Sequence, residues 1–333
     1  MDNDRVRRET VVPPIVERRN PMKKKLLTLF LVAIILSLVL SLTACNTYDP
    51  KVIRLSTTTS VNDSGLMDYL MPHFKADTGY TVEIASAGTG AAINAAKYGN
   101  ADIILVHSKA AEEAFVDEGY ALKLEGRAAE RLPFMYNFFI LVGPNDDPAG
   151  AKDTATIQDA FAAIAEGGYS FVSRGDKSGT HNKEVTLWDS ELGITGETED
   201  QPEGMEWYMS AGSGMGACLT MANEESAYIL TDKATFLSYK NDSAGDKLSN
   251  LKLLYEEDDS LKNTYSILAV DPDAPFVDAI TGNPLEKGKV EINTKGAKAF
   301  ADWMLSAKAK GLIAEYGKDK YGEALFTYSY VLD

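Results

Sequence analysis

Histidine is scarce in this 333-residue chain, which contains only three. His73, His107 and His181 show no spacing typical of metal ligands, apart from the weak pair of His181 and Glu184. The sequence also lacks the phosphate loop G-x-x-x-x-G-K-S and the G-x-S-x-G elbow of serine hydrolases. We therefore expect no metal-cation site and no cofactor.

Basic residues are also few compared with acidic ones. The chain has 33 Lys and Arg residues against 49 Asp and Glu residues, a formal net charge of −16. Nucleic-acid binding needs a basic stripe that neutralises phosphates, and the sequence supplies none. Because an acidic protein repels anions overall, an anion could be bound only through local donors.

Cysteine is rarer still, with two residues in the whole chain. Cys45 ends the segment LTAC, which follows a basic stretch beginning at Met22 and the apolar run 26–42. This pattern resembles the lipobox of bacterial lipoproteins, in which cleavage before the cysteine is coupled to lipid attachment to its sulfur. We predict that residues 1–45 are a signal peptide and lipobox. Translation beginning at Met1 or at Met22 fits this segment.

The mature protein is then a lipoprotein with its membrane anchor at Cys45, facing the periplasm or the cell exterior. The alternative is a plain signal anchor, since the apolar run is nearly long enough to span a bilayer of ~30 Å. With Cys45 lipidated, Cys218 has no partner for a disulfide within one chain. We interpret Cys218 as a small buried hydrophobic residue.

From about residue 51 onward, short β-rich runs alternate with helical patterns, which predicts an α/β fold with a parallel or mixed sheet covered by helices. Residues 52–57, 80–86, 102–106 and 134–143 read as strands. A helix is expected from about Gly65, behind Ser64 as its N-cap. Polar, glycine-rich segments follow several strands, which is where open α/β sheets bind ligands.

Two of these segments are candidate anion loops. Thr58, Thr59 and Ser60 follow the first strand, and hydroxyls and free backbone N–H groups at a helix start can hold an anion. Gly88 and Thr89 lie in SAGTG, between the second strand and a small-residue helix, where glycine allows backbone amides to approach a bound group. Ordinary capping and a plain tight turn are the alternatives.

The third candidate is SRGDKSGTH, residues 173–181. Arg174 offers planar paired donors for an oxyanion, and Asp176 could hold its guanidinium. Ser178, Gly179 and Thr180 would add hydroxyl and amide donors at the start of a helix. A cell-adhesion tripeptide has little relevance in a bacterial lipoprotein, so the anion cradle is the favoured interpretation.

Together these motifs resemble the tungstate-binding solute receptors of ABC uptake systems, over nearly the whole mature chain. The segments that carry the resemblance are SRGDKSGTH, LSTTTS with SGLMDYLMPHF, ASAGTGAA, ADIILVHSKAAEEAFVDEGY and AYILTDKATFL. The resemblance implies a two-lobed periplasmic-binding-protein fold of type II, with two crossover strands and the ligand in the interlobe cleft. It also implies tungstate or molybdate as the ligand, and an ABC permease with its ATPase as partners of a monomeric, non-enzymatic receptor.

We expect one lobe to combine residues 51–138 and 266–333 and the other to contain residues 139–265. The resemblance implies that Thr58 or its neighbours, Ser60, Arg174 and Thr180 hold the oxyanion. The predicted ligand-binding set is Thr58, Thr59, Ser60, Gly88, Thr89, Arg174, Ser178, Gly179 and Thr180, with His107 and Thr231 as further candidates at the cleft.

Phosphate is the close rival, because phosphate receptors carry a similar cradle. Phosphate near neutral pH retains a proton and needs a carboxylate acceptor, whereas tungstate and molybdate need only donors. In phosphate receptors this carboxylate follows the strand that corresponds to residues 102–106, and here that position is occupied by His107. A carboxylate would repel a fully ionised anion. Asp63 or Asp102 could still supply one, which keeps a phosphate-binding receptor as the alternative.

An enzyme is the second class considered. Ser178 with His181 as its base would make an exported hydrolase, but these residues are only three positions apart and no orienting acid accompanies them in the sequence. We therefore expect a binding protein.

Overall fold

The computed structural model describes residues 49–196, 201–242, 244–256 and 258–330. The predicted signal peptide and the lipid-attachment residue Cys45 lie outside the described residues. From Pro50 onward the chain forms one unit. Within the described ranges, no helix combines the length and the apolar character needed to cross a bilayer.

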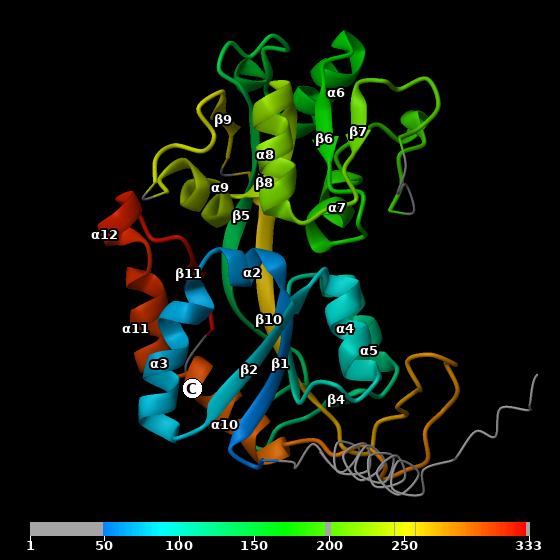
Figure 1. Cartoon of the computed structure of the whole chain (residues 1–333), viewed down its shortest axis with the longest axis vertical. Coiled ribbons are helices and arrows are strands. Elements are labelled where there is room, and N and C mark those ends of the chain that lie inside the picture. Colours follow the sequence, from blue (N-terminus) through cyan, green and yellow to red (C-terminus); the bar gives the residue numbers. More distant parts are fainter. Residues whose placement is uncertain (1–48, 197–200, 243, 257, 331–333) are drawn as a thin grey trace, which may run out of the picture. The chain divides into compact units, whose positions relative to one another are not determined.

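A mixed β-sheet organises the unit, which confirms the predicted α/β class (Figure 1). Its strands lie in the order β2-β1-β3-β10-β5-β8-β6-β7. Three further strands lie outside this order: β4 (Ala121–Leu122) pairs with β10, and β9 (Leu251–Tyr255) and β11 (Thr327–Tyr328) pair with β5. The first group of strands is parallel: β1 (Val52–Thr58), β2 (Thr81–Ala87) and β3 (Ile103–Val106). The second parallel group is β6 (Phe171–Ser173), β7 (Tyr208–Ser210) and β8 (Tyr228–Asp232).

Two long strands connect these groups. β5 (Leu132–Pro144) and β10 (Lys262–Val270) pair antiparallel to each other and run between the two groups (Figure 1). Along β5 the partner changes within one step, because Phe138 faces Lys262 of β10 and Phe139 faces Asp232 of β8. One half of β5 therefore belongs to the first group of strands and the other half to the second.

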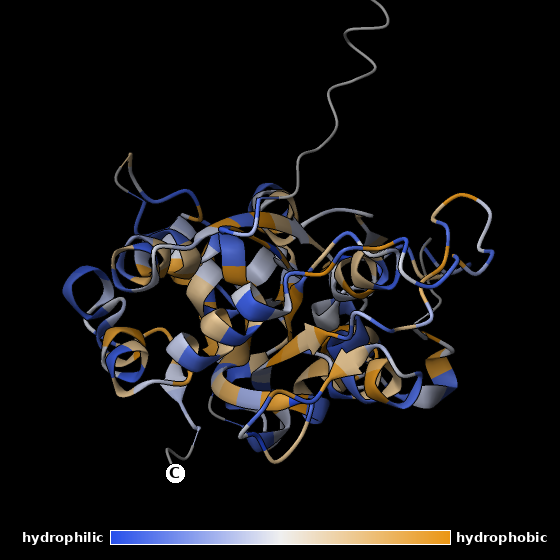
Figure 2. Ribbon diagram, turned by 90° about the horizontal axis from the view of Figure 1, so that it is seen from below, coloured by the Kyte–Doolittle hydropathy of each residue, from blue (hydrophilic) through white to orange (hydrophobic). Residues whose placement is uncertain are grey.

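Helices cover both groups. The first group is accompanied by α2 (Thr59–Asp63), α3 (Leu66–Thr78), α4 (Thr89–Lys97), α5 (Lys109–Asp117), and the C-terminal α10 (Thr294–Met304), α11 (Ala307–Glu315) and α12 (Lys318–Tyr321). The second group is accompanied by α6 (Ile157–Gly167), α7 (Gly179–Glu184), α8 (Met215–Glu225) and α9 (Lys233–Lys240). Figure 2 shows hydrophobic colour concentrated on the central strands, whereas the surrounding helices carry both colours. This pattern is what one-sided burial of amphipathic helices produces.

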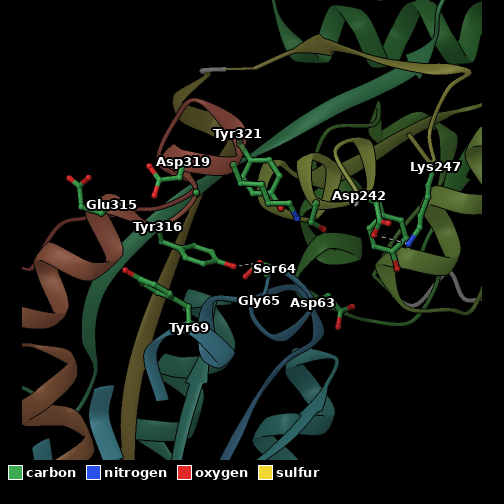
Figure 3. Close-up of a pocket in the computed structure, with 14 residues that line it drawn as sticks. Asp63, Ser64, Gly65, Tyr69, Asp242, Lys247, Glu315, Tyr316, Asp319 and Tyr321 are labelled. Carbon is green, nitrogen blue, oxygen red and sulfur yellow. Dashed lines mark hydrogen bonds and ion pairs between the residues drawn. The ribbon is translucent and has the colours of Figure 1, made fainter. Parts of the chain in front are cut away.

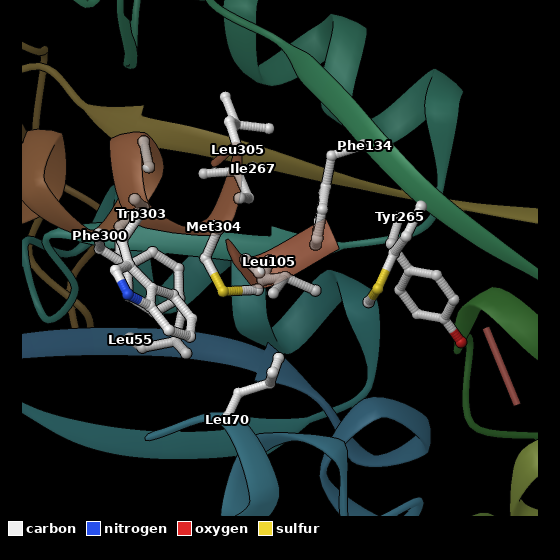
Figure 4. Close-up of a cluster of buried hydrophobic side chains, with 14 of the residues drawn as sticks. Leu55, Leu70, Leu105, Phe134, Tyr265, Ile267, Phe300, Trp303, Met304 and Leu305 are labelled. Carbon is white, nitrogen blue, oxygen red and sulfur yellow. The ribbon is translucent and has the colours of Figure 1, made fainter. Parts of the chain in front are cut away.

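The largest apolar cluster lies between the first group of strands and the helices α3 and α10 (Figure 4). Leu55 of β1 and Leu105 of β3 meet Leu70 of α3, and Phe300 and Met304 close the cluster from α10. Separate buried clusters lie around β5, β6 and β8 in the second group. Each group of strands thus has its own core, and this leaves the carboxyl ends of the strands free to carry polar loops.

The start of α3 differs from the expectation. Gly65, not Ser64, is the N-cap, with a left-handed backbone (φ 79°) that favours glycine. Ser64 instead donates its hydroxyl to the Val61 carbonyl and accepts from the Leu66 N–H, at 2.7 and 3.3 Å. The reason is that the chain already forms a short helix, α2, directly after β1, so Ser64 lies at the end of one helix as well as before the next.

Candidate functional site

Three segments distant in the sequence meet where the two groups of strands face each other. Arg174 Nη2 lies 3.5 Å from Thr59 Oγ1. A Cβ atom on Gly88 would lie 3.7 Å from Cα of Ser178. The structure thus brings the start of α2 and the start of α4 against the SRGDKSGTH motif, which runs from the end of β6 into α7.

Arg174 is the buried charge at this junction, with 3% of its surface exposed. Its Nη2 donates to Asp176 Oδ2 at 2.5 Å, and Asp176 Oδ1 accepts from the Ser178 N–H at 3.1 Å. The predicted role of Asp176 in holding the guanidinium therefore matches the geometry. Arg174 Nε is buried and has no hydrogen-bond partner among the described residues.

Two buried hydroxyls from the predicted set also have no partner within the described ranges: Thr89 Oγ1 at the start of α4 and Thr180 Oγ1 in α7. Leaving a buried donor without an acceptor costs about 1–3 kcal/mol. A ligand that only accepts hydrogen bonds would remove this cost at both threonines and at Arg174 Nε.

The remaining predicted hydroxyls take part in local hydrogen bonds. Thr58 Oγ1 lies 3.1 Å from Ser60 Oγ, and Ser60 Oγ lies 3.1 Å from His107 Nε2. Ser178 Oγ accepts from the His181 N–H at 3.2 Å as the N-cap of α7, and its own hydroxyl proton stays available.

His107 touches both sides of the junction. Its ring lies against Tyr265, with ring centroids 4.9 Å apart, and a Cβ on Gly179 would fall 2.5 Å from His107 Cε1. Burial, and after it the positive charge of Arg174, lowers the pKa of His107 to about 4. The imidazole is therefore neutral at neutral pH and brings polarity to the site without adding a charge.

Of the two carboxylates proposed as phosphate acceptors, Asp102 lies away from the junction. Asp102 precedes β3 whereas His107 follows it, and Asp102 is held by Arg54 at 2.6 Å and by the Asn293 N–H at 2.9 Å. Asp63 is exposed at the end of α2, where it lines a separate groove (Figure 3). The position of Asp102 does not support a role as the acceptor. Partial burial raises the pKa of Asp63 and the charge of Arg174 acts in the opposite direction, so Asp63 stays a candidate acceptor.

Sequence reasoning missed the buried Asp232, which follows the candidate Thr231. Both of its oxygens are used by Thr235, whose N–H and hydroxyl donate at 2.9 and 2.7 Å. Burial raises the pKa of Asp232 to about 6, and the charge of Arg174 acts in the opposite direction. Its sequence signal is D-x-x-T, a typical helix cap. Thr231 itself is buried in β8, with its hydroxyl donating to the Asp232 carbonyl at 3.3 Å.

Ser178 and His181, the pair considered for hydrolysis, form hydrogen bonds to the backbone. Ser178 Oγ accepts from the backbone of His181, and His181 Nδ1 accepts from the Lys177 N–H at 3.1 Å. Both groups therefore stabilise the first turn of α7 and its preceding loop. This is not the nucleophile-to-base hydrogen bond that serine catalysis uses.

Glu184, at the end of α7, is a structural residue that the sequence alone could not assign. It is 1% exposed and accepts hydrogen bonds from Ser173 Oγ (2.5 Å), Trp188 Nε1 (2.9 Å) and Tyr208 OH (2.9 Å). These bonds fasten the helix that carries Thr180 to β6 and β7. Burial raises the pKa of Glu184 to about 7.

Among the described residues no group of three or more His, Cys, Asp or Glu side chains could hold a metal ion.

We predict that Glu184 makes folding stability fall as pH rises. The unfolded chain releases this proton near the ordinary pKa of 4.5 and the folded chain near 7, so the folded state loses its advantage between these values. Thermal melts of Glu184→Gln and the wild type should diverge in favour of the variant by at least about 1 kcal/mol from pH 5 to pH 8, because one pKa unit is worth about 1.4 kcal/mol. A difference that is constant with pH would contradict this role.

Comparisons with known proteins identify the family and the fold. Residues 47–308 match the family model described as a PBP superfamily domain. The tungstate-binding protein TupA of Peptoclostridium acidaminophilum is 47% identical over 277 residues, which are 83% of this chain and 85% of that protein.

Two solved structures are similar over most of the chain. The tungstate-binding protein TupA from Desulfovibrio alaskensis G20 is 35% identical, with a TM-score of 0.63, and the match covers 84% of this chain and 99% of that one. The tungstate ABC transporter structure from Geobacter sulfurreducens is 34% identical, with a TM-score of 0.63, and the match covers 81% and 100%. With the family model, these matches confirm the expected two-lobed periplasmic-binding-protein fold.

Proposed function

Because the chain belongs to the PBP superfamily and, within it, to the family of TupA tungstate-binding proteins, we propose that it binds tungstate for an ABC importer. Molybdate, a tetrahedral dianion of nearly equal size, is the second ligand of this class. The single observation that supports the proposal best is the set of buried donors without partners at the junction, Arg174 Nε, Thr89 Oγ1 and Thr180 Oγ1.

The proposed cradle is a set of donors around one positive charge. Arg174 supplies the charge and a fork of N–H groups, and Thr89 and Thr180 supply hydroxyls from α4 and α7. Thr58 and Ser60 supply hydroxyls from the end of β1 and the start of α2. The other members of the proposed set are Thr59, Gly88, Ser178 and Gly179. Gly179 allows the close approach of His107, because a side chain at this position would overlap the ring.

Hydrogen-bond polarity is what would favour tungstate over phosphate. Hydrogenphosphate must donate its proton to an acceptor, and two carboxylates near Arg174 are already used: Asp176 by Arg174 and the Ser178 N–H, and Asp232 by Thr235. Tungstate carries no proton at neutral pH, so an all-donor site suits it. A phosphate-binding receptor remains the second candidate, since Asp232 lies close enough for the charge of Arg174 to influence its pKa.

Isothermal titration calorimetry with tungstate, molybdate, phosphate and sulfate tests the proposal. We expect stoichiometric binding of tungstate, competition by molybdate, and phosphate weaker by at least ~10-fold, because an unmatched buried donor or acceptor costs about 1–3 kcal/mol. Sulfate, which like tungstate carries no proton at neutral pH, shows whether ligand size adds to hydrogen-bond polarity. Phosphate captured in preference to tungstate would overturn the assignment. Screening of ester and phosphoester hydrolysis, with Ser178→Ala as the control, checks the enzymatic alternative in the same preparation.

Ligand binding is proposed to close two lobes onto the anion. The lobes would be residues 51–138 with 266–333, and residues 139–265. The change of partner between Phe138 and Phe139 in β5 supports a boundary at this position. An anion that touches both lobes makes more contacts in the closed state than in the open one, and this difference drives closure.

The closed receptor would then deliver its ligand to the permease and ATPase of the importer, outside the cytoplasm. We propose that it is held at the outer side of the cytoplasmic membrane as a monomeric lipoprotein, cleaved before Cys45 and anchored through a lipid on the Cys45 sulfur. Similarity to the tungstate ABC transporter structure from Geobacter sulfurreducens supports a role in import. Mass spectrometry of the N-terminal peptide from membranes checks the lipid.

A further inference from the structure

A groove of about 660 Å³ borders the proposed cradle and is lined by cationic side chains. It lies between the start of α5, β5, α7 and β10, and two of its lining residues, His107 and Gly179, also belong to the junction described above. Its charged lining residues are Lys109, Arg131, Lys183 and Lys262, and its lining contains no carboxylate among the described residues. We call this the basic groove.

Two of these four cations form no ion pair with a described residue, although the charge of Asp258 acts on one of them, Lys183. Arg131 is balanced by the buried Glu112 at 2.6 Å, and Lys109 faces Glu113 at 3.7 Å. Lys183 and Lys262, in contrast, form no ion pair with any described residue, and the Lys262 Nζ lies 4.0 Å from the ring centre of Tyr136.

Lys183 occupies a special position on α7. It lies three residues beyond Thr180, on the same short helix, and is only partly exposed. Burial lowers its pKa, and the charge of Asp258 acts in the opposite direction. A partly desolvated ammonium without an ion pair favours the approach of an anion, because water there screens its charge less than at an open surface.

The structure has a second groove, on the other side of β10, with the opposite charge. It has a volume of about 550 Å³ and lies between α2, α3, α9 and α11–α12 (Figure 3). Its charged lining residues are Asp63, Asp242, Glu315, Asp319, Lys247 and Lys320, and Lys247 is paired with Asp242 at 2.8 Å. We call this the acidic groove. Figure 1 shows α9 and α12 on one side of β10 and α5 and α7 on the other.

We propose that the basic groove is the capture surface for the dianion, and that Lys183 and Lys262 draw it towards the cradle. The whole chain carries a formal charge of −16, so its average field repels tungstate. A cleft lined by one sign of charge focuses the field and can raise an association rate by roughly 10- to 1,000-fold. The acidic groove would repel the same dianion, so approach is directed to one side. This inference rests on the proposed function.

Association kinetics test the proposal. The full mature chain with Lys183→Gln and Lys262→Gln is mixed rapidly with tungstate, and binding is followed by tryptophan fluorescence or by rapid filtration of radiolabelled tungstate. We expect the association rate constant to fall by about fivefold at ~20 mM salt, and the loss to shrink above roughly 0.3 M salt as screening shortens the reach of the charges. The dissociation rate constant should change by less than about twofold, because neither lysine is proposed to contact the bound anion.

A matched control removes the same two charges from the acidic groove, through Lys247→Gln and Lys320→Gln. Both double variants change the net charge equally, so an effect of overall charge would slow both alike. Equal slowing, no slowing, or a change confined to dissociation would each overturn the capture surface. If the wild-type chain does not bind tungstate in calorimetry, the proposed function is overturned. If the wild type binds tungstate and the Lys183→Gln, Lys262→Gln variant associates as fast as the wild type, only this inference is overturned.

Discussion

Replacing Arg174 by alanine is expected to weaken tungstate binding by at least about 2 kcal/mol, which is roughly 30-fold in the dissociation constant. Arg174 is the buried cation at the junction, and its Nε has no partner among the described residues. Its removal would take away the charge-assisted donors and leave Asp176 facing the dianion without its counter-ion. Titration calorimetry measures the effect directly.

Two further variants serve as controls for the Arg174→Ala result. Arg174→Lys keeps the charge but not the planar fork, so we expect an intermediate loss. Arg127→Ala removes an arginine that pairs with Asp302 and lies outside the junction, so its affinity should match that of the wild type. Melting temperatures without ligand show whether each variant is folded. Unchanged affinity in a folded Arg174→Ala variant would remove Arg174 from the proposed site.

The order of elements could be predicted because strongly apolar runs stand out from their neighbours. The run FMYNFFILVG is too long and too apolar for a loop, and the structure extends it to β5, Leu132–Pro144. The polar segments after the strands were also predictable as site candidates, since the carboxyl ends of parallel strands gather at one edge of a sheet. Sequence order also shows at which end of a strand a residue lies. Asp102 comes before β3 and His107 after it, so Asp102 lies at the end of the strand away from the site.

Other features depend on contacts that sequence does not reveal. The helix α2 has only five residues, which is too short for a periodic pattern to identify. Glu184 and its three donors come from α7, β6, β7 and the segment that contains Trp188, and only folding brings them together. The sign of charge in each groove is equally hidden, because Lys183 and Lys262 are far apart in the sequence and meet only in space.

The contact between Gly179 and His107 leads to the second prediction with a large expected effect. A Cβ atom on Gly179 would lie 2.5 Å from His107 Cε1 and 2.8 Å from Nδ1, closer than real Cβ atoms come to a ring. The two residues stand on opposite sides of the junction, so a folded Gly179→Ala chain can relieve the overlap by staying more open. Overpacking of this kind costs about 1–3 kcal/mol. Tungstate affinity measured by calorimetry should therefore fall by about 5- to 150-fold, while the melting temperature without ligand stays close to that of the wild type.

A double-mutant cycle separates this overlap from a general disturbance of α7. His107→Ala alone removes one of the two partners of Ser60 Oγ and should cost a modest part of the affinity. Adding Gly179→Ala to His107→Ala should then cost little more, because the ring that the new methyl group would strike is gone. The two changes are thus expected to be strongly non-additive, as residues in direct contact are. If Gly179→Ala weakens binding equally in both backgrounds, the loss arises within α7 itself, and the approach of His107 to Gly179 is not what limits closure around the anion.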